Sequence, residues 1–102
     1  GSTFIDAPRF VMEVLSDSTE NYDRNEKKEL YREQEVDEYW IVDWRKKQVE
    51  IYNLDYNEHG QPQYYLWKIV TQEQKEELDF ANFPNLNITF DELFAEVDDY
   101  GR

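Results

Sequence analysis

The sequence contains no cysteine, one histidine, three glycines and three prolines among its 102 residues. Without cysteine the chain has neither a disulfide framework nor a cysteine-ligated zinc site. No apolar run approaches the roughly 18 residues of a membrane-spanning helix, and no signal peptide can be recognised. We therefore expect a cytoplasmic protein without a membrane partner.

Basic residues are also scarce, with eleven Lys and Arg against twenty-four Asp and Glu and a net charge of −13. Affinity for nucleic acid comes largely from neutralising phosphates, so an acidic surface disfavours DNA and RNA as partners. The ordinary explanation of such a balance is a solubilising surface. It counts against any proposal that the chain binds DNA.

Aromatic residues are abundant, with eight Tyr, six Phe and three Trp. This argues against disorder despite the charge. The length suits one domain spanning residues 1–102, in which Gly1 and Ser2 resemble an expression remnant and are left out of the fold argument.

A strand–helix–strand unit is predicted in the first half of the chain. Residues 10–15 (FVMEVL) form a short apolar run that predicts a buried strand. A polar turn follows, and Asp23 with Glu26 gives a capping-box pattern that opens a helix reaching about Gln34. Its apolar positions are Leu30 and Tyr31, and Lys28 and Arg32 are expected on its solvent side. The next strand covers residues 39–42, and a helical crossover implies parallel pairing of the two strands.

The second half predicts antiparallel strands and a short helix. Residues 39–42 and 49–54 read as a hairpin, and residues 64–70 as a further antiparallel strand after a loop over 55–62. Residues 78–86 are expected to be extended or irregular. Thr89 and Glu92 form a second capping box, which predicts a helix over 91–97 with fraying beyond it. Leu93, Phe94 and Val97 are expected to face the core. The fold class is α/β with a mixed (α+β) sheet.

Two charged residues stand in costly places. Period two puts Val11, Glu13 and Leu15 on one face of the first strand. A carboxylate there needs a partner, a proton or a metal ion. Lys27 shares a helix face with Leu30 and Tyr31, over the carboxyl end of that strand. On the residues alone, a structural ion pair or an exposed sheet face is favoured for Glu13, and a lysine with its ammonium in water is favoured for Lys27.

The other polar candidates have ordinary explanations. Ser16 belongs to the turn, Asp23 caps the helix and His59 lies in a Gly/Pro loop without a second ligand nearby. The tyrosines and tryptophans stand mostly at strand spacing, which is typical of core packing.

The run over residues 7–43 resembles the Uma-two family of restriction-endonuclease-like proteins, within the PD-(D/E)XK nuclease superfamily. The family's pattern is a Pro, an EVLS strand, an S-x-S/T turn, D-x-x-x-K, a Tyr and a Gly-Val-x-Glu-Tyr-Trp-Ile-Val-Asp run. The matching residues are Pro8, Glu13, Val14, Leu15, Ser16, Ser18, Thr19, Asp23, Lys27, Tyr31, Val36, Glu38, Tyr39, Trp40, Ile41, Val42 and Asp43. A weaker match continues to Phe94, so the resemblance covers nearly the whole chain.

The resemblance implies a restriction-endonuclease-like core and a metal-dependent site. It makes Glu13 a metal ligand and Lys27 the catalytic lysine, moved from the strand onto the helix; Leu15 occupies the superfamily's usual lysine position. Such a site holds Mg²⁺ or Mn²⁺ and activates water for attack on a phosphodiester. The family would act on DNA.

Two departures qualify this resemblance. The family's first metal-binding Asp lies on an earlier strand, and Asp6 in the lead-in is a poor substitute. Glu35 stands where the family has a helix-ending Gly, so it must adopt positive φ or end the helix differently. We expect the chain to be the C-terminal part of a longer endonuclease-like domain or a homo-oligomer that supplies the missing strands.

Two functions remain open. One is a Mg²⁺-dependent DNA endonuclease whose activity is absent or small in these 102 residues alone. The alternative is a non-catalytic interaction module that retains the nuclease fold, which the charge of −13 and the missing acid favour.

Overall fold

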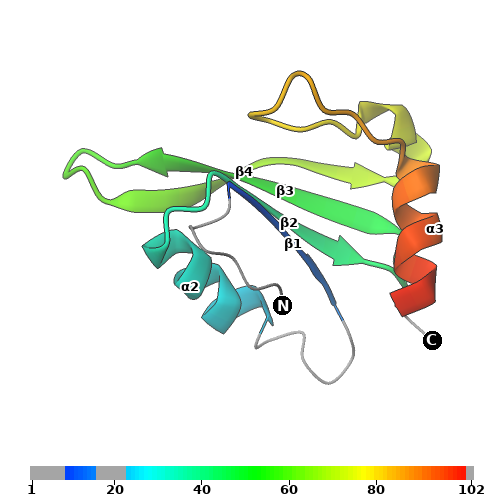
Figure 1. Ribbon diagram of the computed structural model, residues 1–102, viewed down its shortest axis with the longest axis horizontal. Helices are drawn as coiled ribbons and strands as arrows, with labels where there is room; N and C mark the ends of the chain where they lie inside the picture. The colour runs from blue at the N-terminus through cyan, green and yellow to red at the C-terminus, as the bar shows by residue number, and fades with distance from the viewer. Residues whose placement is uncertain (1–8, 16–22, 101–102) are drawn as a thin grey trace.

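The computed structural model describes residues 9–15 and 23–100. Within them, four strands form one sheet in the order β1-β2-β3-β4 (Figure 1). The strands are β1 (Phe10–Val14), β2 (Glu38–Asp43), β3 (Gln48–Tyr56) and β4 (Pro62–Thr71). β1 pairs parallel with β2, and the other two pairings are antiparallel. The predicted mixed sheet, parallel unit and hairpins are confirmed.

The two predicted helices lie close to their expected places, while the 3₁₀ segment after β4 was not predicted. A π-helical turn, η1 (Asp23–Lys27), leads into α2 (Lys28–Glu33). A 3₁₀ segment, η2 (Gln72–Glu77), follows β4, and α3 (Phe90–Tyr100) ends the described chain. The predicted helix over 23–34 was wrong in one respect, since its first turn is wider than an α-helical turn. Wide turns of this kind often occur at functional sites.

The sheet has a core on each face. On the α3 face, Trp40, Val42, Val49 and Ile51 are buried with residues of α3, and Phe10, Met12 and Val14 pack against them. On the α2 face, Leu15, Tyr39 and Ile41 are buried, and Val11, Tyr31, Tyr52 and Tyr64 pack against them. The alternation predicted for the first strand is therefore confirmed.

Helix α3 begins with the predicted capping box. The Thr89 hydroxyl accepts a hydrogen bond from the Glu92 amide at 3.1 Å, and the Glu92 carboxylate accepts one from the Thr89 amide at 3.4 Å. Leu93 and Phe94 are buried, as predicted. The predicted end near residue 97 was wrong because the sequence has no helix-stopping Gly or Pro before Gly101.

Helix α2 presents a different face to the sheet from the one predicted. Leu30 is 47% exposed. Lys28, which was expected to face solvent, places its ammonium 4.0 Å from the centre of the Tyr52 ring. Arg32, also expected to face solvent, donates to the Pro62 carbonyl at 3.3 Å. The inward positions are thus 27, 28, 31 and 32, because the charged ends of Lys28 and Arg32 reach β3 and β4.

Glu35 ends α2 in the left-handed region, with φ of 55°. The Val36 amide donates to the Tyr31 carbonyl and the Glu35 amide to the Arg32 carbonyl, both at 3.0 Å. These are the two hydrogen bonds of a Schellman motif, in which glycine normally occupies this position. The expectation that Glu35 adopts positive φ is confirmed, and its carboxylate accepts a bond from the Tyr56 hydroxyl at 2.7 Å.

Glu38 holds the irregular segment after η2 against the α3 face. Its carboxylate is fully buried and accepts bonds from the Trp40 indole at 2.7 Å, the Ala81 amide at 3.0 Å and the Asn82 amide at 2.8 Å. The Asn82 side chain donates a further bond at 3.2 Å. Residues 78–86 are irregular, as predicted. The Glu38 carboxylate accepts hydrogen bonds from backbone amides of this segment, which in a regular strand would bond to a neighbouring strand.

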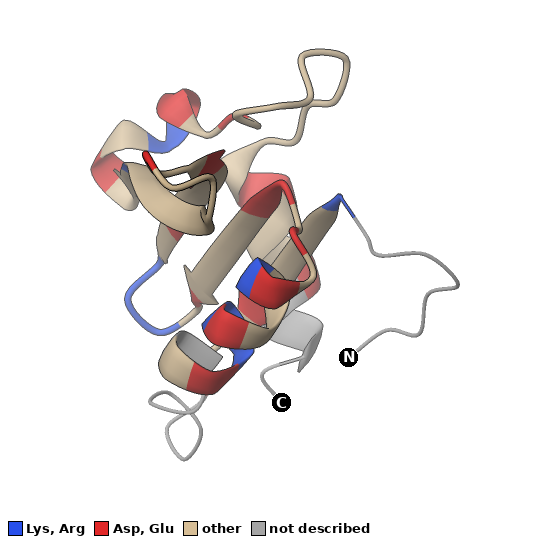
Figure 2. Ribbon diagram, turned by 90° about the vertical axis from the view of Figure 1, so that its left-hand side faces the viewer, with Lys and Arg blue, Asp and Glu red and all other residues tan. Residues whose placement is uncertain are grey.

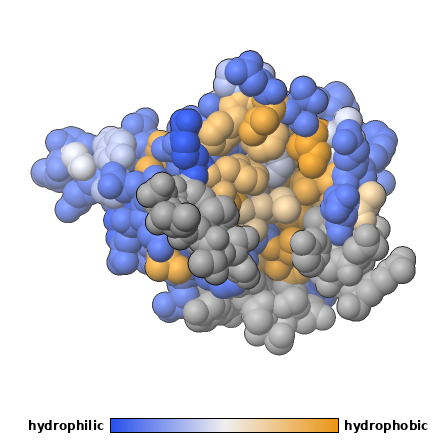
Figure 3. Space-filling view, viewed as in Figure 1, coloured by the Kyte–Doolittle hydropathy of each residue, from blue (hydrophilic) through white to orange (hydrophobic). Residues whose placement is uncertain are grey.

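β1 forms one edge of the described sheet. All five of its residues are half-buried. Figure 3 shows apolar surface on this side of the molecule, between the α2 and α3 layers. The sequence likewise predicted a pairing partner for β1 on one side only, namely the strand that follows the helix.

Replacing Glu35 with glycine should stabilise the fold. Glycine adopts positive φ without the steric cost that a β-carbon brings, so Glu35→Gly should raise the free energy of unfolding by roughly 0.5–1 kcal/mol. Urea denaturation measures the change. Glu35→Ala is the matched control, since it also removes the carboxylate but keeps a β-carbon, and it should be no more stable than the wild type. Equal stability of the two variants would contradict the explanation.

Removing the Glu38 carboxylate should strongly destabilise the fold. Glu38→Ala leaves several buried donors without an acceptor, so the free energy of unfolding should fall by about 3 kcal/mol or more. Glu58→Ala, a change at a side chain that is 87% exposed, should shift stability by less than about 0.5 kcal/mol. Thermal and urea unfolding compare the two, and a similar effect of both would show that the buried network is not needed.

Candidate functional site

The two charged residues singled out in the sequence lie side by side. The Lys27 ammonium is 3.2 Å from Glu13 Oε2. The Tyr31 hydroxyl donates to Glu13 Oε1. The Glu13 side chain is 13% exposed and that of Lys27 is 29% exposed. A carboxylate inside the sheet thus has a cationic partner and a neutral donor, one at each oxygen.

Local geometry explains this convergence. Glu13 stands opposite Ile41 in the β1–β2 register, on the face that α2 covers. Lys27 and Tyr31 are four residues apart on the helix that crosses this face, so their side chains reach the same point. On the residues alone, a Lys27 ammonium in water was favoured over this pairing, so the structure corrects that expectation. The part of Tyr31 was missed, although its i+4 spacing from Lys27 was the available signal.

The β3–β4 hairpin fixes the other end of α2. The Tyr64 hydroxyl donates to the Val36 carbonyl at 2.6 Å, and burial raises the pKa of Tyr64. The hydrogen bond to Glu35 is the largest cause of the raised pKa of Tyr56. Both tyrosines therefore remain neutral donors at physiological pH. These bonds set the position of the helix and, through it, of Lys27.

Glu38 and Glu50, two other buried carboxylates, do not join Glu13. Glu38 lies beside Trp40 on the α3 face, so the sheet separates it from Glu13. Glu50 is 7% exposed and lies on the same face as Glu13, but Ile41 stands between them in the cross-strand row. Two strand spacings put their Cα atoms roughly 10 Å apart. Glu50 accepts a bond from the Tyr52 hydroxyl at 2.6 Å. Sequence reasoning missed this second carboxylate.

Glu13 fits a hard cation as a single ligand. Each carboxylate oxygen has two acceptor sites, and the bonds from Lys27 and Tyr31 take one site on each oxygen. Mg²⁺ is commonly bound through one or two carboxylates together with water and substrate phosphates. In the part of the chain that the structure describes, no group of three or more His, Cys, Asp or Glu residues could surround an ion. Glu13 alone therefore supplies part of a metal site.

None of the remaining sequence candidates is placed at this site among the described residues. Asp6, Ser16 and the side chain of Asp23 lie outside the described part of the chain, so their predicted roles stay predictions. His59 is exposed, 3.6 Å from Glu58, as expected of a loop residue. No helix among the described residues is long and apolar enough to span a membrane.

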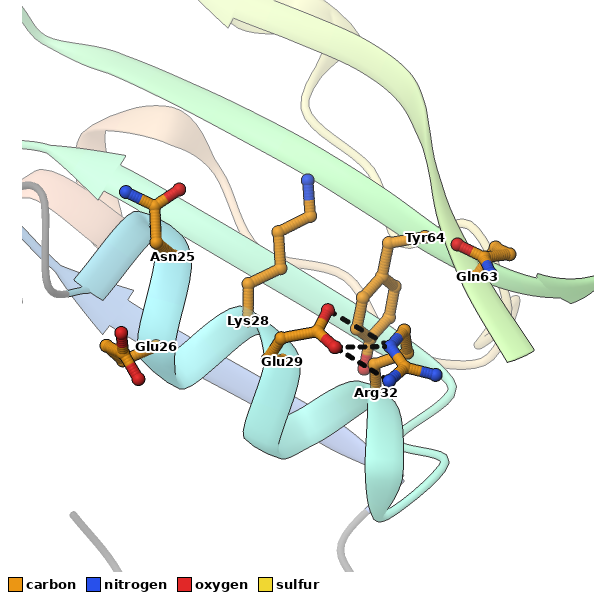
Figure 4. A pocket seen from close by; sticks show the side chains of 7 residues that line it. All are labelled: Asn25, Glu26, Lys28, Glu29, Arg32, Gln63 and Tyr64. Carbon is orange, nitrogen blue, oxygen red and sulfur yellow. Dashed lines mark hydrogen bonds and ion pairs between the residues drawn. The ribbon is translucent and has the colours of Figure 1, made fainter. Parts of the chain in front are cut away.

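A polar cavity of about 490 Å³ lies on the other side of α2, between that helix and the start of β4 (Figure 4). Arg32 forms an ion pair with Glu29 at 2.7 Å, and this bond lowers the pKa of Glu29. The two charges cancel, which leaves the cavity without a clear preference for an anion. Its lining residues are Asn25, Glu26, Lys28, Glu29, Arg32, Gln63 and Tyr64.

Charge is unevenly distributed around the site. Figure 2 shows acidic and basic residues alternating along α2 and a continuous basic segment in the β2–β3 turn. This turn contains Arg45, Lys46 and Lys47, and the Asp43 carboxylate accepts bonds from the Arg45 and Lys46 amides at 3.1 and 3.0 Å. The turn follows the carboxyl end of β2, next to the strand that carries Glu13. It thus places three basic side chains at this end of an acidic molecule.

The comparisons with known proteins agree with the resemblance seen in the sequence. The fold is similar to the crystal structure of a putative nuclease of the DUF820 group from Anabaena variabilis ATCC 29413, with a TM-score of 0.62 and 17% sequence identity. That similarity covers 90% of this chain and 46% of the other, so the chain spans less than half the length of its structural relative. No curated protein gave a significant match. The model of the Uma2 family, described as "Putative restriction endonuclease", matches residues 2–91. The chain therefore belongs to the Uma2 family.

Proposed function

We propose that this chain is part of a Mg²⁺-dependent endonuclease that hydrolyses phosphodiester bonds in DNA, with Glu13 and Lys27 in its active site. The observation that carries the proposal is the 3.2 Å pairing of Lys27 with a largely buried Glu13 in a chain that belongs to the Uma2 family. Charged groups in such surroundings are costly unless they are paired, and sites of this kind are often functional.

Each residue has a distinct task in this proposal. A bound Mg²⁺ would polarise the phosphate and lower the pKa of a bound water. Glu13 would contribute a carboxylate ligand to that ion. Lys27, with a mobile ammonium on a long stem, would donate hydrogen bonds to the attacking water or to a phosphate oxygen where negative charge develops. Its contact with Glu13 keeps it close to the reacting phosphate.

The proposed metal site needs further ligands. Glu13 is one carboxylate, and substrate phosphates and water provide others. We propose that an acidic residue outside the described part of the chain, or one from a second copy, completes the set. On this view the 102 residues alone have little activity.

The alternative is a non-catalytic interaction module with the same fold. The acidic balance and the single carboxylate at the site favour it. Calorimetric titration of the 102-residue chain and of the full-length protein with Mn²⁺ separates the two. One-site binding by the full-length protein supports the endonuclease, and absence of binding by both supports the module.

Loss of Lys27 should abolish cleavage by the full-length protein. Lys27→Ala removes the donor to the developing charge, and Mg²⁺-dependent nicking of plasmid DNA should slow by roughly 100- to 10,000-fold. Lys46→Ala, an equal change of charge at an exposed turn residue, should retain most of the cleavage rate. Undiminished cleavage by Lys27→Ala would refute the assignment.

A further inference from the structure

We propose that Tyr31 is a positioning residue that fixes the orientation of the Glu13 carboxylate for a bound cation. The inference rests on the proposed function, because it assigns a role within the same site. Its starting point is that the Tyr31 hydroxyl donates to Glu13 Oε1 while Lys27 donates to Oε2. Each oxygen has its own donor, and both donors come from one helical segment.

Two donors restrict a glutamate more than one donor does. The terminal torsion of Glu is broad and roughly two-fold, so a carboxylate with one partner can still turn about its last bond. Lys27 alone leaves this freedom, since its long stem follows the carboxylate. A second donor at the other oxygen fixes the carboxylate plane. The remaining acceptor sites of Glu13 then point in a constant direction.

Tyr31 is itself well fixed. Its ring centre lies 5.3 Å from that of Tyr39 at an interplanar angle of 60°, and Tyr39 is completely buried. Tyr39 in turn packs against Tyr52 and Tyr64, with ring centres 6.1 and 5.8 Å away. A tyrosine has few rotatable bonds, so a packed ring holds its hydroxyl in place. The packed aromatic rings thus fix the Tyr31 hydroxyl relative to the sheet, and this hydroxyl in turn holds the Glu13 carboxylate.

The competing explanation is a structural one. A half-buried tyrosine needs a partner for its hydroxyl, and Glu13 could serve only that need. The two explanations differ in their consequences for a cation. Hydrogen-bonding partners of metal ligands typically change metal affinity by about 10- to 100-fold when they are removed. A purely structural hydroxyl affects stability and leaves metal affinity unchanged.

The test compares Tyr31→Phe with Tyr52→Phe in the full-length protein. Both changes remove one hydroxyl and keep the ring, but the Tyr52 hydroxyl bonds Glu50 at 2.6 Å and not Glu13. Calorimetry with Mn²⁺ alone should show roughly 10- to 100-fold weaker binding for Tyr31→Phe and less than about two-fold change for Tyr52→Phe. The carboxyl ¹³C signal of Glu13 should shift only in Tyr31→Phe. Circular dichroism melts verify that both variants are folded.

The outcomes separate this inference from the proposed function. If the wild type binds Mn²⁺ and Tyr31→Phe binds it equally well, the positioning role is wrong while the metal site stands. If both tyrosine variants lose affinity equally, the effect is a general loss of packing, and the specific role of Tyr31 is also wrong. If the wild-type protein binds no Mn²⁺, the proposed function fails and the role of Tyr31 toward a cation fails with it.

Discussion

The cost of placing the Glu13 carboxylate within the sheet is the constraint on which the rest of the structure depends. A charge in such a position needs close partners, and β1 and its neighbour β2 offer apolar side chains on that face. The partners come from the helical crossover, as Lys27 and Tyr31. The position of α2 is therefore not only a matter of apolar packing. It is also set by the need to bring two donors to one carboxylate.

The carboxyl-terminal end of α2 is held in place by contacts with the β3–β4 hairpin. Tyr56, Tyr64 and the Pro62 carbonyl bind the last turn of the helix and the residues just after it. Glu35 accepts a left-handed backbone conformation so that the chain can turn from the helix into β2. The β3–β4 hairpin thus helps to position the site. Among the described residues, no hydrogen bond joins this hairpin directly to Glu13.

Two buried carboxylates on opposite faces show how differently the fold treats a charge. Glu38 is surrounded by backbone amides, an indole and a side-chain amide, which are fixed neutral donors that tie a loop to the sheet. Glu13 is paired with a lysine whose side chain is 29% exposed. The buried hydrogen bonds of Glu38 stabilise the fold. The Glu13–Lys27 pair keeps its charges within reach of solvent, which suits exchange with a ligand.

Much of this arrangement could be predicted from sequence. The alternation around Glu13, the helical crossover and the capping box at Thr89 identified the mixed sheet and its faces. Glu13 and Lys27 were singled out as charges in costly places, and the family resemblance, rather than the residues alone, joined them in one site. The inward face of α2 could not be predicted, because the cationic ends of Lys28 and Arg32 reach the sheet while Leu30 is exposed. The role of Glu38 depends on contacts between distant segments, which local patterns do not encode. The role of Tyr31 had a local signal in its i+4 spacing from Lys27, and this signal was missed.

The central claim is that Lys27 donates directly to the Glu13 carboxylate. Scalar coupling across that hydrogen bond, between the Lys27 side-chain nitrogen and the Glu13 carboxyl carbon, tests it most directly by NMR at low temperature. The structure predicts a slowly exchanging Lys27 ammonium signal with a measurable coupling that disappears in Glu13→Gln. A Lys27 signal that exchanges as fast as that of Lys46 and shows no coupling would contradict the account.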